Sequence, residues 1–380
     1  MLEVPIAALD PATRLAGAGL HDSAVWLATN GPDVDAVQTM VIDAAPDGTG
    51  AHEGIYRARF RAGPTPATLH PVVLLGLPLA EAEQWEPTTV LGSLSGPVRT
   101  EFDDSRAAAV AGLVRAAAAS APGAVILPMM GHRAALALAP LVPHSTLVLG
   151  PVVSGHEALP VTETQYLRQL GPRKRALWRT EDRMLRDGGR EIVEGRLTPD
   201  LVEDLIALQR QTQRRHLAPG GTRIVRARML ALLKSPLAPH TTIFRCLAGG
   251  ALVGYAMTVE YGDTLHLLSI GLDYASIGRH AEYPHLISHA PVRHAIARGL
   301  RRVDLGIGGT HQKYVRGAVP QLTWTLLANS PPGWSAESAR SISRARALAT
   351  LAEVGRRLPP EQRAALASYE NASPRLTGSD

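Results

Sequence analysis

Short apolar runs separated by glycine, proline and aspartate recur in the first part of the chain. Such runs predict strands, whereas an alanine-rich stretch over 105–121 predicts a helix on propensity alone. The run over 54–62 alternates apolar and charged residues, which is typical of a half-exposed antiparallel strand. The strands expected here cover residues 24–29, 37–44, 54–62, 70–76, 123–130 and 145–153, with a short helix before the last of them.

The second part of the chain begins with helical spacing and continues with alternation. A strand pair joined at Gly249-Gly250 has the signal of a tight hairpin. The helices expected here cover residues 198–216, 226–234, 285–300 and 337–358, and the strands cover 241–249, 251–262, 264–273, 301–308 and 322–329. The two parts therefore share an order of elements, although no repeat is visible residue by residue.

A basic segment connects the two parts. Residues 160–188 predict helical structure that begins near Pro172 and stops at Gly188-Gly189. Arg175, Arg179 and Arg183 recur every four residues and so share one helix face, with Arg173, Lys174 and Arg186 beside them. The net charge of +5 is therefore unevenly spread. Either this face is simply solvated or it contacts a polyanion, and both interpretations stay open at this point.

Composition narrows the class of protein. Apolar residues make up 45% of the 380 residues, which is enough for sizeable cores. No apolar run approaches the ~18 residues of a membrane span, and the N-terminal segment lacks the basic and apolar regions of a signal peptide. The single cysteine, Cys246, excludes an intrachain disulfide and fits a reducing cytoplasm, so we expect a cytoplasmic protein. The nucleophile elbow, the P-loop and the dinucleotide fingerprint are absent from the sequence.

One lysine draws attention because lysine is so rare here. Of the 39 lysines and arginines, only Lys174, Lys234 and Lys313 are lysines. Lys313 lies in GIGGTHQKYVRGA (306–318), directly after the strand-like RRVDLGIG. Lysine is a compact point charge and arginine a planar fork, so a lysine retained in an arginine-rich chain indicates a role that needs its shape. The alternative is a chance survivor on a solvated loop.

The order of elements in the second part resembles the GNAT acyltransferase fold. Two helices, a three-stranded antiparallel meander, a loop into a helix and a further strand follow one another. The stretch from Gly249 to Ala318, with its DLGIGGTHQK segment, is similar to one branch of this superfamily. That branch contains the Fem-type peptidyltransferases, which use aminoacyl-tRNA to extend peptidoglycan precursors, and double-GNAT relatives from actinobacterial natural-product clusters. The resemblance covers residues 160–330 and extends to residues 20–155 in layout only.

The resemblance implies an α/β (α+β) fold with two tandem GNAT-like domains, each a mixed, largely antiparallel sheet flanked by helices. The divisions expected are a degenerate GNAT-like domain over 1–158, a basic connecting helix over 159–190, a catalytic GNAT-like domain over 191–335, and a C-terminal helix with a disordered tail over 336–380.

Two motifs depart from the family pattern. In acetyl-CoA-using GNAT proteins a glycine-rich loop holds the pyrophosphate through backbone amides at a helix N-terminus. The corresponding loop here, SIGRHAEYPHL (276–286), is a poor cradle because it has one glycine, an acid and a proline, although Arg279 and His280 could still meet a phosphate. The T-x-R motif of Fem-type enzymes that bind nucleotide-linked muropeptide is matched by Thr212 and Arg214. Ala218 stands where that motif has an aromatic residue, which argues against muropeptide as the acceptor.

The resemblance also assigns roles to residues. Lys313 would stabilise negative charge on the ester as an amine attacks it. The expected general base is His280, Glu282 or His285. The expected substrate-binding residues are Thr212, Arg214, Arg279, Tyr283, His311, Tyr314, Arg316 and Trp324, with packing as the alternative for Tyr314 and Trp324. His285 and His289 have a spacing that can bind zinc, but no third ligand is placed in the sequence, so we expect no metal and no tightly bound cofactor.

The leading hypothesis is an acyltransferase that moves an aminoacyl group from aminoacyl-tRNA to an amine of a small metabolite or peptide. The expected tRNA-binding residues are Arg173, Lys174, Arg175, Arg179 and Arg183. One alternative is acyl-CoA-dependent N-acyl transfer by the same fold, and another is an inactive GNAT-like binding module.

Overall fold

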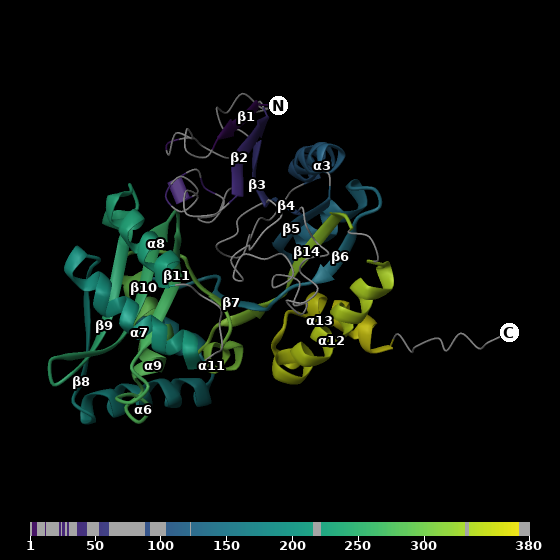
Figure 1. Ribbon diagram of the computed structural model, residues 1–380. Coiled ribbons are helices and arrows are strands. Elements are labelled where there is room, and N and C mark those ends of the chain that lie inside the picture. The colour runs from purple at the N-terminus through teal and green to yellow at the C-terminus, as the bar shows by residue number, and fades with distance from the viewer. Residues whose placement is uncertain are drawn as a thin grey trace.

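The computed structural model describes residues 2–5, 36–43, 53–60, 88–91, 104–121, 123–215, 222–330 and 334–371, together with Ala12, Ser23, Val25, Trp26 and Thr29. These residues form two seven-stranded sheets, each packed against helices, which lie side by side (Figure 1). Within this part of the chain no helix is both long enough and apolar enough to span a membrane.

The first sheet is built mainly from the first part of the chain. Its strands, in spatial order, are β1 (Leu2–Pro5), β2 (Ala36–Asp43), β3 (Glu53–Phe60), β4 (Thr88–Leu91), β5 (Ala124–Gly131), β14 (Thr323–Asn329) and β6 (Thr146–Leu149). The helices around it are α3 (Asp104–Ser120), α4 (His132–Leu138), α12 (Ala336–Val354) and α13 (Pro360–Asn371).

The second sheet is built mainly from the second part. Its strands, in spatial order, are β13 (Val319–Gln321), β7 (Val153–His156), β12 (Arg302–Ile307), β11 (Thr264–Leu272), β10 (Ala251–Tyr261), β9 (Thr241–Ala248) and β8 (Arg190–Arg196). Its helices are α5 (Glu163–Gln169), α6 (Pro172–Asp187), α7 (Val202–Arg215), α8 (Thr222–Lys234), α9 (Glu282–Pro284), the π-helical turn η8 (His285–His289), α10 (Ala290–Ala297) and α11 (Thr310–Tyr314). Among the described strands only β4–β5 and β11–β12 pair in parallel, so both sheets are mixed and largely antiparallel, as expected.

A two-stranded ribbon joins the two sheets. Residues 146–156 and 319–329 run antiparallel along its whole length, pairing as β6 with β14 in the first sheet and as β7 with β13 in the second. At the crossing point Gly150 lies so close to the opposite strand that a Cβ there would be 2.5 Å from Thr323 Oγ1. The strand expected at 322–329 within the C-terminal domain therefore lies in the first sheet, and the strand expected at 145–153 is split between the two sheets.

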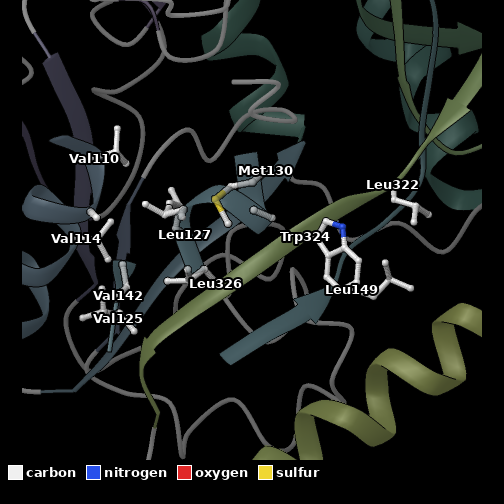
Figure 2. Packing of buried hydrophobic residues seen from close by; sticks show 14 of the residues in the cluster. Val110, Val114, Val125, Leu127, Met130, Val142, Leu149, Leu322, Trp324 and Leu326 are labelled. Carbon is white, nitrogen blue, oxygen red and sulfur yellow. The ribbon is translucent and has the colours of Figure 1, made fainter. Parts of the chain in front are cut away.

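Apolar side chains on both faces of β5 explain its continuous apolar run. Val125 and Leu127 pack with Val114 of α3 in one cluster (Figure 2). Ile126 packs with Ala339 of α12 in another. Successive side chains of a strand point to opposite faces, so a strand covered on both faces has no polar positions to alternate with. Each fully buried aliphatic side chain of this kind contributes about 1.5–3 kcal/mol.

The second sheet is also covered on both faces. Leu205 of α7 packs with Ile243 of β9 and Tyr255 of β10 on one face. Trp178 of α6 packs with Val292 of α10, and with strands β11 and β12, on the other. This second cluster fixes the position of α6, the helix that carries the basic segment.

Most expected elements are confirmed, and the Gly249-Gly250 hairpin has the positive φ angles that its turn requires. The strand expected at 24–29 is wrong, because its described residues Val25, Trp26 and Thr29 are helical and Thr29 Oγ1 donates to the Val25 carbonyl. Strands β1, β4, β8 and β13 and helices α9, α11 and α13 were not predicted. The strand expected at 70–76, and the expected tail beyond residue 371, lie outside the described residues.

Candidate active site

Strands β11 and β12 separate in the middle of the second sheet. Their parallel pairing ends at His266 and Asp304. Gly306 then adopts a left-handed φ of 66°, and its N–H donates to Oδ1 of Asp304 at 2.9 Å. At the same level a register shift leaves Leu268 of β11 without a partner on β10. From Leu267 onward no described strand pairs with this edge of β11, so backbone N–H groups there can face a ligand.

Lys313 holds the end of β12 in place. Its Nζ donates to three carbonyls, those of Leu305 at 2.6 Å, Gly306 at 3.2 Å and Ile307 at 2.9 Å, and the residue is only 4% exposed. An ammonium group has three N–H donors in a compact arrangement, whereas a planar guanidinium cannot direct its donors onto three successive carbonyls. In this geometry the lysine replaces the hydrogen bonds that β12 loses on leaving β11, and its expected oxyanion role stays a prediction.

Glu282 occupies the loop in which the family holds a pyrophosphate. Its Oε2 accepts hydrogen bonds from the N–H groups of Gly278 at 3.3 Å and His280 at 3.1 Å, and Arg190 Nε lies 3.1 Å from Oε1. The side chain is 1% exposed. Burial alone would raise the pKa of this carboxyl, but the hydrogen bonds from backbone N–H groups and Arg190 outweigh it and hold the pKa below its usual range. Glu282 is therefore an anchor of its loop, and its expected role as a general base stays a prediction.

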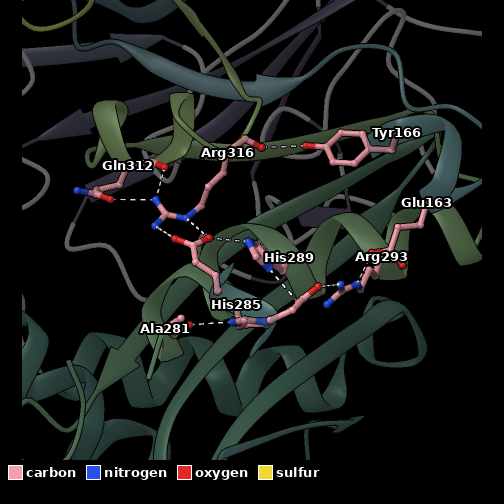
Figure 3. A network of polar contacts seen from close by, with 10 residues as sticks. Glu163, Tyr166, Ala281, His285, His289, Arg293, Gln312 and Arg316 are labelled. Carbon is pink, nitrogen blue, oxygen red and sulfur yellow. Dashed lines mark hydrogen bonds and ion pairs between the residues drawn. The ribbon is translucent and has the colours of Figure 1, made fainter. Parts of the chain in front are cut away.

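A network of buried charges lies between α6 and α10. Glu181 accepts hydrogen bonds from Nε2 of His289 at 2.9 Å and from two nitrogens of Arg316, whose third nitrogen donates to Gln312 (Figure 3). Every guanidinium nitrogen of Arg316 thus has a protein partner, and the side chain is buried. Arg316 thus ties the segment after α11 to α6, and its expected substrate-binding role stays a prediction. The acids of this network are Glu181 and Asp182, both on α6.

Asp182 binds the next part of the same network. Its Oδ1 lies 3.0 Å from Nε2 of His285, and its Oδ2 accepts from Arg293 at 2.7 Å. Burial would raise the pKa of this carboxyl, but its histidine and arginine partners hold it far below the usual range. The other nitrogen of His285, Nδ1, faces the Ala281 carbonyl at 2.8 Å. Both ring nitrogens of His285 are thus engaged, whereas the ring of His280 is half-buried and packs against Gly188. The expected role of either histidine as a general base stays a prediction.

Two expected substrate-binding residues serve the fold instead. The hydroxyl of Thr212 donates to Leu208 within α7 and accepts the N–H of Leu272, which attaches α7 to β11. Trp324 lies in the core of the first sheet, where its Nε1 donates to Nδ1 of His132 at 3.0 Å. The sequence could not show this, because the ribbon carries residue 324 out of the second sheet.

The remaining expected residues stay predictions. Arg279 and Arg214 are exposed, and Tyr283 is half-buried with its hydroxyl beside Gly309. Burial is the main cause that raises the pKa of Tyr283. His311 is exposed and faces Arg357, 2.8 Å from its guanidinium.

Tyr314 joins α11 to the basic helix. Two cations lie over its ring, with Lys174 Nζ 3.8 Å and Arg357 Cζ 4.3 Å from the ring centroid. Each such contact contributes about 0.5–1 kcal/mol at a partly exposed site. On the same helix Arg173, Arg179 and Arg183 are exposed and Arg175 is half-buried. The arginine face of α6 is thus solvent-accessible, while Glu181 of the same helix is buried and Asp182 is half-buried.

A cavity of about 640 Å³ lies beside the buried network. Its apolar part is formed by Leu185, Ile192 and Phe244, and its polar part includes Asp182 and His285. The other lining residues are Arg186, Glu194, Ala290, Arg293, His294 and Ala297. It lies over β8 and β9, next to α6 and α10, rather than at the separation of β11 from β12.

Known proteins share part of this sequence and most of this fold. Residues 172–314 match the family described as acetyltransferase (GNAT) domain. The structure is similar to the crystal structure of FemX, with 11% identity, a TM-score of 0.55, and coverage of 87% of this chain and 97% of that one. No curated protein matches the sequence.

Two further solved structures have a similar fold. One is the C-terminal DUF2156 domain assigned to a lysylphosphatidylglycerol synthetase from Agrobacterium fabrum, with 9% identity, a TM-score of 0.52, and coverage of 87% of this chain and 92% of that one. The other is a conserved protein of unknown function from Bacteroides thetaiotaomicron VPI-5482, with 13% identity, a TM-score of 0.50, and coverage of 85% and 94%. At these identities the likeness concerns the fold alone. The chain therefore contains a GNAT acetyltransferase domain at residues 172–314 and has, over most of its length, a fold similar to that of FemX.

Proposed function

We propose that this protein transfers an aminoacyl group from aminoacyl-tRNA to an amine of a small molecule or peptide. The observation that carries the proposal is the carboxylate of Glu282 in the loop that precedes η8. It accepts the N–H groups of Gly278 and His280, which a CoA pyrophosphate would need, and it places a negative charge where that anion would lie. The donor is therefore expected to be held by other means than a pyrophosphate cradle.

The arginine face of α6 could bind a polyanionic donor such as tRNA. Arg173, Arg179 and Arg183 are exposed, and α6 belongs to the GNAT domain itself. Arginines on one face of a helix can contact successive phosphates of an RNA backbone, and each contact releases counterions. The charge network beneath α6 holds this face in a fixed position relative to α11 and β12.

The chemistry follows from the separated strands. The acceptor amine attacks the ester carbonyl, and the developing oxyanion would be stabilised by backbone N–H groups of β11 beyond Leu267. His280 would take the proton that the amine loses. Collapse of the tetrahedral intermediate forms the amide and breaks the ester, and the ribose hydroxyl leaves with a proton.

The test compares donors and then the basic helix. The purified chain is incubated with labelled aminoacyl-tRNAs or acyl-CoAs and a panel of amines, and transfer is read as label that becomes stable to mild base. Binding of charged tRNA is measured at several salt concentrations for wild type and for a variant carrying Arg173→Ala, Arg179→Ala and Arg183→Ala. For each phosphate contact removed, the slope of log K against log salt should fall by about 0.7–0.9.

A matched variant carries Arg340→Ala, Arg356→Ala and Arg363→Ala, which remove the same charge from exposed positions on the C-terminal helices. This control should leave the slope close to that of wild type. Transfer from acyl-CoA alone, or equal slopes for the two triple variants, would contradict the proposal.

A further inference from the structure

Three side chains that commonly bind metal ions converge at the edge of the cavity. Oδ1 of Asp182 lies 3.0 Å from Nε2 of His285 and 3.5 Å from Nδ1 of His289, and all three atoms lie within 4.8 Å of one another. Helix α6 supplies the carboxylate and η8 supplies both imidazoles. Sequence spacing could not indicate this third ligand, because Asp182 lies 103 residues before His285.

The opposite ring nitrogens are already held by acceptors. Nδ1 of His285 faces the Ala281 carbonyl at 2.8 Å, and Nε2 of His289 faces the carboxylate of Glu181 at 2.9 Å. Histidines that bind metals almost always use their second nitrogen in this way, because the contact fixes the tautomer and the ring orientation. Oδ2 of Asp182 is likewise held, by Arg293 at 2.7 Å.

Hydrogen bonds alone do not account for this arrangement. Among the described residues Nδ1 of His289 makes no hydrogen bond of ordinary geometry, although the side chain is 0% exposed, and its one polar contact is the 3.5 Å approach to Oδ1 of Asp182. Leaving a buried polar atom unsatisfied costs about 1–3 kcal/mol. The ring itself is clamped, since it stacks on Trp178 with ring centroids 3.7 Å apart and planes 7° from parallel. Nδ1 is therefore fixed in its direction toward Asp182.

The backbone that carries the two histidines also has an unusual conformation. Residues 285–289 form a π-helical turn that ends just before Pro291 at the start of α10. Proline has no N–H, so the α-helical bond back to residue 287 cannot form, and the wider turn accommodates this loss. Short π-helical turns of this kind occur frequently at functional sites.

The distances fit a tetrahedral ion. With metal–ligand distances of about 2.0–2.1 Å, the ligand atoms of a tetrahedral zinc site lie about 3.3 Å apart. The observed separations of 3.0 and 3.5 Å bracket this value. We propose that Asp182, His285 and His289 bind one divalent first-row transition metal ion, with zinc as the ion to test first. In that site the ion takes the place of the proton between Asp182 and His285.

Such a site would leave one coordination position open. Asp182 and His285 both line the cavity of about 640 Å³, so the fourth position faces it. Catalytic zinc sites differ from structural ones in having three protein ligands and an open position. The cavity would admit a ligand with an oxygen or nitrogen donor for the metal and an apolar body for Leu185, Ile192 and Phe244.

The experiment uses the untagged full-length chain. Its metal content is measured by inductively coupled plasma mass spectrometry as purified, after chelation, and after dialysis against Zn²⁺. Co²⁺ is then added to the stripped protein, and the visible bands of four-coordinate Co²⁺ are recorded. We expect about one ion per chain, displacement of Co²⁺ by Zn²⁺, and a melting temperature that rises with metal concentration.

Variants separate this site from incidental binding. Asp182→Asn, His285→Ala and His289→Ala should each abolish the Co²⁺ bands. The matched control is His294→Ala, which removes another buried histidine that lines the same cavity and pairs with Glu194 and Glu260. It should bind the ion as wild type does.

Circular dichroism shows whether each variant is folded. If the ligand variants fail to fold, the wild-type titration still decides the question. The proposal is overturned if stripped wild-type protein takes up neither Zn²⁺ nor Co²⁺. It is also overturned if the His294→Ala variant loses metal uptake as fully as the His289→Ala variant does.

Discussion

Replacing Lys313 by methionine separates a structural lysine from a catalytic one. Methionine has a similar length and no charge, so the change removes the three hydrogen bonds from Nζ to the carbonyls of Leu305, Gly306 and Ile307. Hydrogen bonds to charged groups contribute about 1.5–3 kcal/mol each. Only the Leu305 end of this segment is buried, whereas Gly306 is half-buried and Ile307 exposed, so water can replace part of the loss at those two carbonyls. We expect Lys313→Met to lower the free energy of unfolding by about 3 kcal/mol.

The assay is thermal unfolding followed by circular dichroism, with transfer activity measured on the same preparations. For a domain of 150–250 residues each kcal/mol shifts the melting temperature by about 2–4 °C, so the expected decrease is about 6–12 °C. Lys313→Arg should also destabilise, because the planar fork cannot reach three successive carbonyls.

The matched control is Lys234→Met, an exposed lysine at the end of α8, which should melt close to wild type. A Lys313→Met protein that melts with wild type but has lost transfer would refute this reasoning. That result would show that Lys313 acts in the transfer reaction rather than in the stability of the fold.

Two further predictions concern Glu282 and Trp324. The folded-state pKa of Glu282 is lowered, so its contribution to stability is present above the unfolded pKa of about 4.3 and is lost as the pH falls below it. Glu282→Gln should therefore lower the free energy of unfolding at pH 7 by about 1–3 kcal/mol. In urea unfolding at several pH values, the stability of this variant should depend less on acid pH than that of the control Glu337→Gln, whose carboxylate is exposed. Parallel curves of stability against pH for the two variants would count against the anchor role. Trp324→Phe leaves Nδ1 of His132 without its donor and should cost about 1–3 kcal/mol in chemical denaturation, whereas an unchanged midpoint would show that the hydrogen bond contributes nothing.

Local signals in the sequence determined most of the elements. The Gly249-Gly250 pair needs positive φ at both residues, which only a few residue types adopt without strain, so the hairpin is encoded in two positions. Helix α6 has a proline at its first position, Pro172, and a glycine, Gly188, directly after its last residue, so both of its ends are encoded locally. Strand β8 was missed because it is an edge strand of mostly half-exposed residues, REIVEGR, with no clear apolar face.

The sequence also pointed to residues that matter, although it could not show what they contact. Lys313, Glu282, His285 and Arg316 are all buried and all hold polar contacts. Their roles depend on partners that no local pattern reveals. Lys313 donates hydrogen bonds to carbonyls at the end of β12, and these carbonyls can be reached only because Gly306 turns β12 away from β11.

The tertiary structure alone decided which sheet each strand joined and which charges met. Strand β14 belongs to the first sheet because the ribbon extends past Gly150, and this pairing joins residues more than a hundred positions apart. Glu181 and Asp182 look like solvated acids in a basic helix, yet they meet His285, His289 and Arg316 across a similar distance in the chain. Periodicity records which face of an element is buried, whereas a buried charge is tolerated only where packing supplies its opposite. Those opposites lie on other elements, and only the fold brings them together.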